Sequence, residues 1–249
     1  MSKLTSPLCR VGRKKQIQNS VISQSPKDFT IYVEPFVGSG DIFFAFNFDP
    51  DKVKSYINDK DIDIYTAFNI MKSNPSITNI DKFKGLSIEQ IQTFVSKTYT
   101  NPVDKLARII YLLCGTFGSK GIGKIYKNPN IEPKLRKLPK YAEYLKNTTI
   151  SNKDYKSLFS HDSPNTFFYL DPPYEKSKRL YKDGVIDYKQ MADKLKKLKG
   201  KFLLSINDSA EIREVFKDFK ISGITVLGED KGKSPVGGQN RKELFIKNY

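Results

Sequence analysis

The chain has 249 residues, enough for one large α/β domain with an insertion or for two small domains. Hydrophobic residues make up 38% of it, which supports a genuine core, and 43 Lys and Arg face 27 Asp and Glu, a net charge of +16. This excess predicts a polyanionic partner, nucleic acid first, although a generally basic surface is the simpler alternative.

The few cysteines and the single histidine argue against disulfide-rich proteins and metalloproteins. The only cysteines are Cys9 and Cys114, so neither a disulfide framework nor a Cys-rich zinc site is expected, and the setting should be reducing. The single histidine, His161, argues against a His-based centre, and we expect no metal. No signal-peptide core or membrane-spanning stretch is present, so we expect neither secretion nor membrane insertion.

The chain begins with a basic segment that contains Arg10, Gly12 and Lys14 and is followed by apolar residues at helical spacing. A glycine just before a helix would leave backbone N–H groups pointing at an anion. The alternative is a flexible basic tail.

A strand–loop–helix sequence follows. Residues 30–34 have a strand pattern, residues 35–41 form a tight loop with Gly38 and Gly40, and residues 42–46 resume as a buried helix. Strand, glycine loop and helix in this order are typical of the nucleotide-binding turn of a doubly wound sheet, in which glycines let a ligand approach the backbone.

A second strand, at residues 54–59, ends in an acid. Asp59 lies 19 residues beyond Gly40, close to the spacing at which such folds place a carboxylate on ribose hydroxyls. We favour Asp59 because it ends the apolar run directly. Asp61 or Asp63 could take that role instead, or all three could form a helix N-cap cluster.

Between residues 64 and 144 the pattern changes to helices, at 64–71, 88–97 and 103–114, and no strand is evident. We therefore predict a helical insertion. Its loop from Gly115 onward is rich in glycine, lysine and aromatics, and Lys120, Lys124 and Lys127 would suit phosphate contacts. A solvated linker is the alternative.

The remaining chain returns to alternating strands and helices. A short strand at 149–150 leads to Asp154 and Tyr155, and a closing hairpin is expected from 224–227 and 243–246 across a basic loop at 228–242 that includes Lys231, Lys233 and Arg241. The other expected elements are strands at 166–170 and 201–206 and helices at 190–199 and 210–219.

The strand at 166–170 runs directly into Asp171-Pro172-Pro173-Tyr174. Prolines end a strand because they cannot donate to a ladder, so Asp171 should lie at the carboxyl end of the strand, the edge at which α/β sheets bind ligands. The Asp171 carboxylate and the Pro172 carbonyl could accept the two N–H groups of an exocyclic amine, and Tyr174 could stack on a flipped base. An ordinary Pro-Pro turn is the alternative.

Together, these motifs resemble those of the Dam-like family of DNA adenine-N6 methyltransferases, in one order from about Pro7 to Tyr249. The matching stretches are Arg10-Val-Gly12-Arg13-Lys14, Glu34-Pro-Phe36-Val-Gly38-Ser-Gly40, Asn58-Asp59, Asp154-Tyr155, Asp171-Pro172-Pro173-Tyr174 and the final Glu243–Tyr249. In that order, they resemble the aromatic-x-Gly-x-Lys, Glu-Pro-Phe-x-Gly-x-Gly, Asn-Asp, Asp-Phe and catalytic motifs of the family and its last strand. Arg10 departs from the pattern, since an aromatic residue is usual there, and residues 117–127 are shorter than the usual target-recognition hairpin.

The resemblance implies a Rossmann-like, doubly wound α/β fold with a mostly parallel seven-stranded sheet. It implies S-adenosylmethionine as cofactor and double-stranded DNA as partner, an intracellular location wherever that DNA is, and a monomer or weak dimer. Residues 1–63 and 145–249 would form the catalytic domain, and residues 64–144 the DNA-recognition insertion. The cofactor-binding residues would be Arg10, Gly12, Lys14, Glu34, Phe36, Gly38, Gly40, Asp59, Asp154, Tyr155 and Asp171.

We therefore expect a site-specific enzyme that methylates adenine N6 by base flipping and in-line attack, without a covalent enzyme intermediate. The catalytic residues would be Asp171, Pro172, Pro173 and Tyr174, and the DNA-binding residues Lys14, Lys120, Lys124 and Lys127. Alternatives are methylation of cytosine N4 or of adenine in RNA, and a catalytically silent nucleic-acid-binding protein on the same fold.

Overall fold

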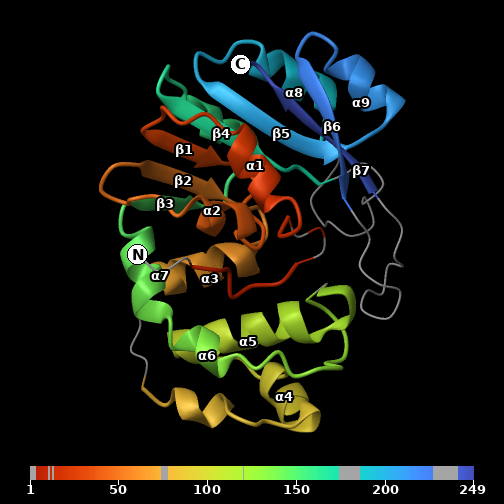
Figure 1. Ribbon diagram of the computed structural model, residues 1–249. Helices are drawn as coiled ribbons and strands as arrows, with labels where there is room; N and C mark the ends of the chain where they lie inside the picture. Colours follow the sequence, from red (N-terminus) through yellow and green to blue (C-terminus); the bar gives the residue numbers. More distant parts are fainter. Residues whose placement is uncertain are drawn as a thin grey trace.

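The computed structural model describes residues 4–10, 12, 14–73, 78–119, 121–173, 186–226 and 241–249. Within this part of the chain, one seven-stranded sheet has the order β3-β2-β1-β4-β5-β7-β6 (Figure 1). β7 is antiparallel to β5 and β6, and the other neighbouring pairs are parallel, which confirms the predicted mostly parallel sheet. The strands are β1 (Ile31–Glu34), β2 (Lys54–Asn58), β3 (Thr148–Ser151), β4 (Thr166–Leu170), β5 (Lys201–Asn207), β6 (Lys220–Val226) and β7 (Arg241–Lys247).

Helices cover both faces of the sheet. One face packs against α1 (Gln18–Gln24), α2 (Asp41–Phe46) and α3 (Ile62–Lys72), and the other against η3 (Tyr155–His161), α8 (Tyr188–Leu195) and α9 (Ala210–Val215) (Figure 1). Alternate residues of β4 serve the two cores, because Phe167 and Tyr169 belong to the first and Phe168 and Leu170 to the second. A strand buried on both faces explains the continuous apolar run in the sequence.

The predicted helical insertion lies between β2 and β3 and continues past α3. Figure 1 shows α4, α5 and α6 stacked below the sheet and α7 leading back to it. Their ends follow from local sequence: Ser87 and Gln90 form a capping box on α4, and Asn101 caps α5 with Pro102 in its first turn. These elements are η1 (Ile80–Phe83), α4 (Ile88–Val95), α5 (Pro102–Gly115), η2 (Phe117–Ser119), α6 (Glu132–Leu135) and α7 (Leu138–Leu145).

The insertion shares one hydrophobic core with the sheet. Phe68 and Tyr111 belong to the same cluster as Tyr169, and the Tyr144 hydroxyl donates a hydrogen bond of 3.0 Å to the Phe43 carbonyl. The boundary that we expected between the catalytic domain and the insertion, at residues 63 and 64, falls in the first turn of α3, which begins at Ile62.

A disulfide joins Cys9 to Cys114, with the two Cα atoms 4.9 Å apart. Two cysteines do not make a disulfide framework, but the expectation of reduced thiols is wrong for this pair. The two residues are 105 positions apart, so their contact depends on the N-terminal segment lying along the end of α5, which no local pattern shows.

Several element boundaries differ from the prediction. The helix expected at 210–219 ends at Val215, and β6 begins at Lys220 rather than near Ile224. Helices α6 and α7 were not expected, because prolines in their first turns break the sequence pattern into short pieces. The closing antiparallel hairpin of β6 and β7 is confirmed. No helix in the described ranges is both long and apolar enough to cross a membrane.

Candidate active site

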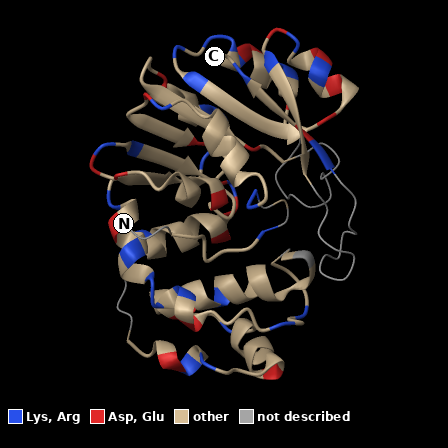
Figure 2. Cartoon of the chain, viewed as in Figure 1, with Lys and Arg blue, Asp and Glu red and all other residues tan. Residues whose placement is uncertain are grey.

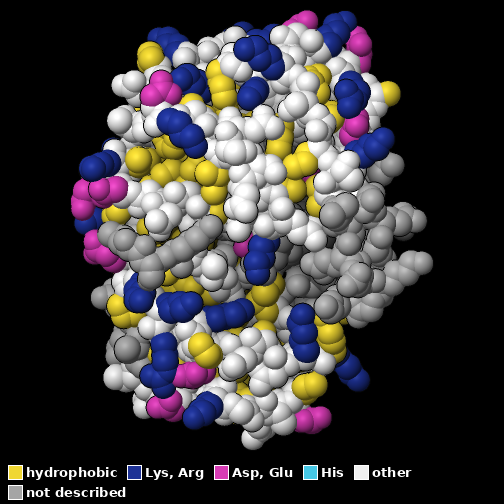
Figure 3. Space-filling model, in the orientation of Figure 1, with side chains coloured by type: hydrophobic (Ala, Val, Ile, Leu, Met, Phe, Trp, Pro, Cys, Tyr) yellow, Lys and Arg dark blue, Asp and Glu magenta, His cyan; other side chains and the backbone are white. Residues whose placement is uncertain are grey.

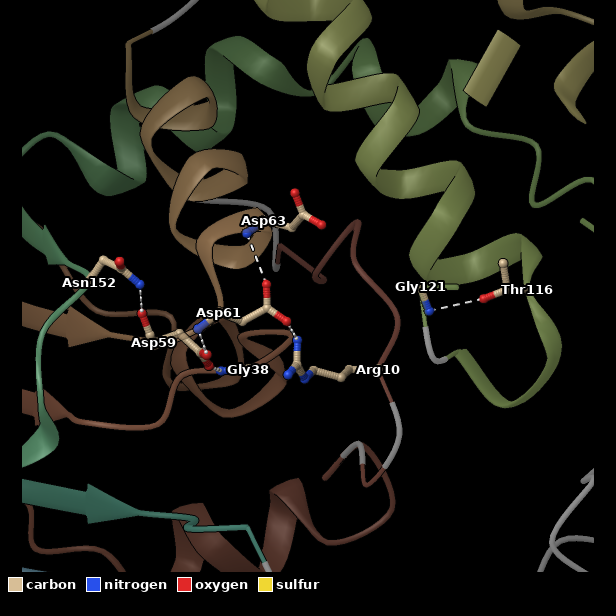
Figure 4. Close-up of polar contacts among 8 residues, drawn as sticks. All are labelled: Arg10, Gly38, Asp59, Asp61, Asp63, Thr116, Gly121 and Asn152. Carbon is tan, nitrogen blue, oxygen red and sulfur yellow. Dashed lines mark hydrogen bonds and ion pairs between the residues drawn. The ribbon is translucent and has the colours of Figure 1, made fainter. Parts of the chain in front are cut away.

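The glycine loop after β1 and the acid after β2 meet at the carboxyl edge of the sheet. The Gly38 N–H donates to Asp59 Oδ2 at 2.8 Å, and the Asp61 N–H donates to Asp59 Oδ1 at 2.9 Å (Figure 4). Gly38 and Gly40 have φ values of +51° and +78°, a region that favours glycine. Burial raises the pKa of Asp59, and the charge of Arg10 opposes this. Among the three candidate acids, Asp59 is therefore the one joined to the glycine loop.

Asp61 has a different role. It is the N-cap of α3, where its Oδ1 accepts the Asp63 N–H at 2.9 Å, as the N-cap alternative suggested. Its Oδ2 lies 2.6 Å from Arg10 Nη1, and Figure 4 shows the Arg10 guanidinium directed at this carboxylate. Burial raises the pKa of Asp61, but the neighbouring Arg10 outweighs it and the net shift is downward. Arg10 thus attaches the N-terminal segment to the same edge by charge, without an aromatic ring.

Asn58 joins three strand ends. Its amide donates at 3.0 Å to the carbonyls of Pro35 and Lys153, and its Oδ1 accepts from the Ser151 hydroxyl at 2.8 Å and the Lys153 N–H at 2.9 Å. It is 1% exposed and holds the ends of β1, β2 and β3 together.

The other predicted cofactor residues divide into buried and exposed groups. Glu34 is 2% exposed, accepts a 2.7 Å hydrogen bond from the Tyr32 hydroxyl, and has a pKa raised by burial. Phe36 packs against Tyr155, with ring centroids 5.1 Å apart. Asp154 is exposed and accepts from the Lys156 N–H at 2.9 Å. Gly12 has a φ of +81° and is exposed.

Asp171 follows β4 directly and forms an ion pair with Lys14, whose Nζ lies 2.9 Å from Asp171 Oδ1. The Lys14 side chain is 6% exposed and that of Asp171 is 21% exposed. Burial raises the pKa of Asp171 to about 6 even though Lys14 opposes the shift. Burial lowers the pKa of Lys14, but the charges of Asp171 and Glu243 outweigh it and keep the ammonium protonated.

Lys14 was predicted to contact both cofactor and DNA. Its burial against Asp171 puts the ammonium inside the site, where a duplex phosphate could not reach it without breaking that ion pair. The expected DNA contact would need that ion pair to break, and it stays a prediction.

The two prolines differ in their surroundings. Pro172 is buried, and the Pro173 carbonyl accepts a 2.7 Å hydrogen bond from the Tyr188 hydroxyl. The Pro173 carbonyl is thus held by α8. Tyr174 lies outside the described residues.

The glycine-rich loop after α5 is a small hairpin. Thr116 and Ile125 form an antiparallel bridge, the Tyr126 N–H donates to the Gly115 carbonyl at 3.0 Å, and the Gly121 N–H donates to Thr116 Oγ1 at 3.1 Å (Figure 4). Lys124 and Lys127 are exposed on it, whereas Lys120 lies outside the described residues. Three large apolar side chains are also exposed there: Phe117, Ile122 and Tyr126.

Positive charge is not confined to this loop. Figure 2 shows Lys and Arg on the strand ends and on the insertion helices, and Figure 3 shows them gathered across the middle of the viewed face, between the sheet and the insertion. Arg241 is exposed at the start of β7, and Lys231 and Lys233 lie outside the described residues.

Ser205 and Glu243 also contact the residues at this edge, and neither was predicted from the sequence as a site residue. Ser205 shares hydrogen bonds with Asp171 and Tyr169, and Glu243 lies 3.8 Å from Lys14. The sequence did contain one indication of them, a serine and a glutamate within otherwise apolar strands. Polar side chains in a buried strand are costly unless they interact with a partner.

Comparison with known proteins gives the same family. The family model for D12 class N6 adenine-specific DNA methyltransferases matches residues 11–227. The type II methyltransferase M1.LlaDCHI of Lactococcus lactis subsp. cremoris is 28% identical over 96% of this chain and 93% of its own length. The type II methyltransferase M.MjaIII of Methanocaldococcus jannaschii is 24% identical over 96% of both chains, and M.CviBI of Paramecium bursaria Chlorella virus NC1A is 26% identical over 90% and 92%. The chain therefore belongs to the D12 class of N6 adenine-specific DNA methyltransferases.

Proposed function

We propose that this enzyme transfers a methyl group from S-adenosylmethionine to N6 of an adenine flipped out of double-stranded DNA, with Asp171 as the acceptor that orients the amine. The observation that carries this proposal is the position of Asp171. Its carboxylate lies at the carboxyl end of β4, in ion-pair contact with Lys14 and beside the strand whose glycine loop would receive the cofactor.

The cofactor would lie over the glycine loop and the end of β2. Gly38 and Gly40 would let the cofactor approach the backbone of the loop closely, and Asp59 would accept hydrogen bonds from its ribose hydroxyls. The rings of Phe36 and Tyr155 would form an apolar wall beside its adenine. The bound cofactor supplies a methyl group on a positively charged sulfur. The residues that line this edge fit it, because the Asp59 carboxylate is held toward the glycine loop by the Gly38 N–H and lies beside backbone with positive φ that leaves room for a ligand.

The chain's own part in the chemistry is orientation. The lone pair of an exocyclic amine is delocalised into its ring, and two acceptors on its two N–H groups would make the nitrogen more pyramidal. The Asp171 carboxylate and the Pro172 carbonyl would be those acceptors. With the cofactor bound, Asp171 would hold N6 toward the methyl group and would accept the proton that N6 loses on methylation, before passing it to solvent.

DNA would be bound through residues 64–144, with the 115–127 hairpin near the duplex. Exposed Lys124 and Lys127 would contact phosphates, and this part of the chain is joined to the cofactor segment by the Cys9–Cys114 bridge. We infer a catalytic unit from residues 1–63 and 145–249, with the insertion as the recognition unit.

Replacing Asp171 by Ala tests the proposal. Turnover should fall at least about 100-fold because the amine loses its charged acceptor, while affinity for duplex DNA should stay within about threefold because phosphate contacts dominate it. Methyl incorporation and equilibrium binding give the two readings, and Asp28→Ala, at an exposed acid far along the chain, is the matched control. Near-normal methylation by the Asp171 variant would contradict the assigned role.

A further inference from the structure

Four polar side chains form a strip on one face of the sheet, at its carboxyl edge. Asn207 and Glu243 are directly paired across β5 and β7, so their side chains lie on the same face. Ser205 is two residues before Asn207 and shares that face. Asp171 comes one residue after the Leu170–Leu204 pair and receives a hydrogen bond from Ser205. The strip therefore runs from Asp171 to Glu243.

Lys14 lies over this strip and contacts both of its acids. Its Nζ is 2.9 Å from Asp171 Oδ1 and 3.8 Å from Glu243 Oε2. The three charged groups come from the N-terminal segment, the end of β4 and the start of β7. One ammonium therefore faces two carboxylates, and this cluster keeps a net negative charge.

Glu243 is the unusual member of this group. Its side chain is 5% exposed, yet Oε2 accepts no hydrogen bond within the described part of the chain. A buried carboxylate oxygen without a donor destabilises a fold, and an apolar residue would avoid that cost at this strand position. A role in the site would explain the acid.

We propose that Glu243 is a positioning residue for methyl transfer, whose carboxylate holds the Lys14 ammonium against Asp171 and provides a second negative charge behind the amine acceptor. This inference rests on the proposed function. In the proposed transfer, positive charge would move from the cofactor sulfur toward N6, which Asp171 would hold. A net negative cluster behind Asp171 stabilises that charge more in the transition state than in the bound substrate, and so raises kcat.

The electrostatic surroundings of Asp171 predict the direction of a further effect. The titratable groups that face it are Lys14 from the N-terminal segment, Glu243 from β7, Tyr169 from β4 and Glu34 from β1. Lys14 lowers the pKa of Asp171 and Glu243 raises it. Neutralising Glu243 should therefore move the acid limb of the kcat profile to lower pH, whereas neutralising Lys14 should move it to higher pH.

The test is Glu243→Gln, which keeps the side-chain shape and removes the charge. We expect kcat to fall about 10-fold, with KM for S-adenosylmethionine and for duplex DNA within about twofold, and an acid limb displaced to lower pH. Glu243→Asp keeps the charge on a shorter side chain and should leave the limb at the wild-type pH with an intermediate kcat. Glu214→Gln, on the exposed face of α9, is the matched control.

A double variant tests whether Glu243 acts through Lys14. Lys14→Met with Glu243→Gln should be slower than Lys14→Met alone, but by less than the fall that Glu243→Gln causes in the wild type, because the second change then removes only the negative charge behind Asp171 and no longer a contact that holds the ammonium. An unchanged kcat and acid limb in Glu243→Gln would overturn the inference. The inference would also be overturned if Glu243→Gln lowered the thermal stability and raised both KM values while the acid limb stayed at the wild-type pH. That result would show a structural role. Absence of methylation by the wild-type enzyme would instead contradict the proposed function.

Discussion

Asp171 is subject to two opposed effects, and their balance sets the pKa of its carboxyl group. Burial disfavours its ionised form, whereas the Lys14 ammonium 2.9 Å away favours it. The result is a pKa of about 6, close enough to neutral pH for the carboxylate to be ionised in use and to hold a proton transiently. An exposed aspartate could also accept a hydrogen bond from the amine. With its lower pKa, however, it would be a weaker base for the proton that the amine loses.

This balance predicts the pH dependence of the enzyme. Because the proposed role needs the carboxylate, kcat should be level above neutral pH and should fall as the pH drops through about 6, the pKa of Asp171. Below it the loss should approach about tenfold per pH unit. In Lys14→Met the cation that lowers the pKa is absent, so the fall should begin at higher pH.

The measurement is kcat against pH at saturating cofactor and DNA, with thermal melts at each pH to exclude unfolding. A wild-type acid limb near pH 4, the usual range of an aspartate, would show that burial does not control this group.

At the scale of elements, the strand–loop–helix unit of β1 and α2 depends on two glycines with different surroundings. A Cβ on Gly40 would lie 2.7 Å from Cζ of the buried Phe68, whereas a Cβ on Gly38 would meet nothing within 4 Å. Both have positive φ, so alanine at either position is strained. Only Gly40 adds a steric conflict.

Gly40→Ala should therefore lower the free energy of unfolding by about 3 kcal/mol, from backbone strain plus overpacking. Gly38→Ala is the matched control and should lose only the strain, about 1 to 2 kcal/mol. Urea unfolding of both variants measures the difference. Equal losses at the two sites would mean that Phe68 moves aside and that the close approach is not a constraint.

The same unit shows what the sequence could predict. The spacing from Gly40 to Asp59 and the run from Thr166 into Asp171 are local signals, because the fold of a strand–loop–helix unit is decided by neighbouring residues. The approach of Glu243 to Lys14, and the bridge from Cys9 to Cys114, join positions far apart in the chain and follow only from sheet order and the path of the N-terminal segment. Sequence patterns identified the motifs, but not these contacts between them.

At the scale of the whole molecule, the net charge of +16 favours DNA binding only where the basic side chains lie on a surface that a duplex can contact. Basic residues are distributed over the sheet edge and the insertion (Figure 2), so charge alone does not define the DNA face. The 115–127 hairpin is distinct because exposed lysines and apolar side chains occur together on it.

The double variant Lys124→Ala and Lys127→Ala tests this face. If both lysines neutralise phosphates, the slope of log affinity against log salt should become shallower by about 2, while cofactor affinity stays unchanged. Lys189→Ala with Lys197→Ala, on and just after α8, is a charge-matched control. An unchanged slope in the hairpin variant would place the phosphate contacts elsewhere, with Arg241 the next candidate.

The most direct test of the central claim is the identity of the modified base. Duplex DNA incubated with the enzyme and S-adenosylmethionine carrying a deuterated methyl group would be digested to nucleosides and analysed by mass. We predict labelled N6-methyladenine from wild-type enzyme and its loss in Asp171→Ala. Labelled N4-methylcytosine, label only in RNA, or no label in any nucleic acid would contradict the account.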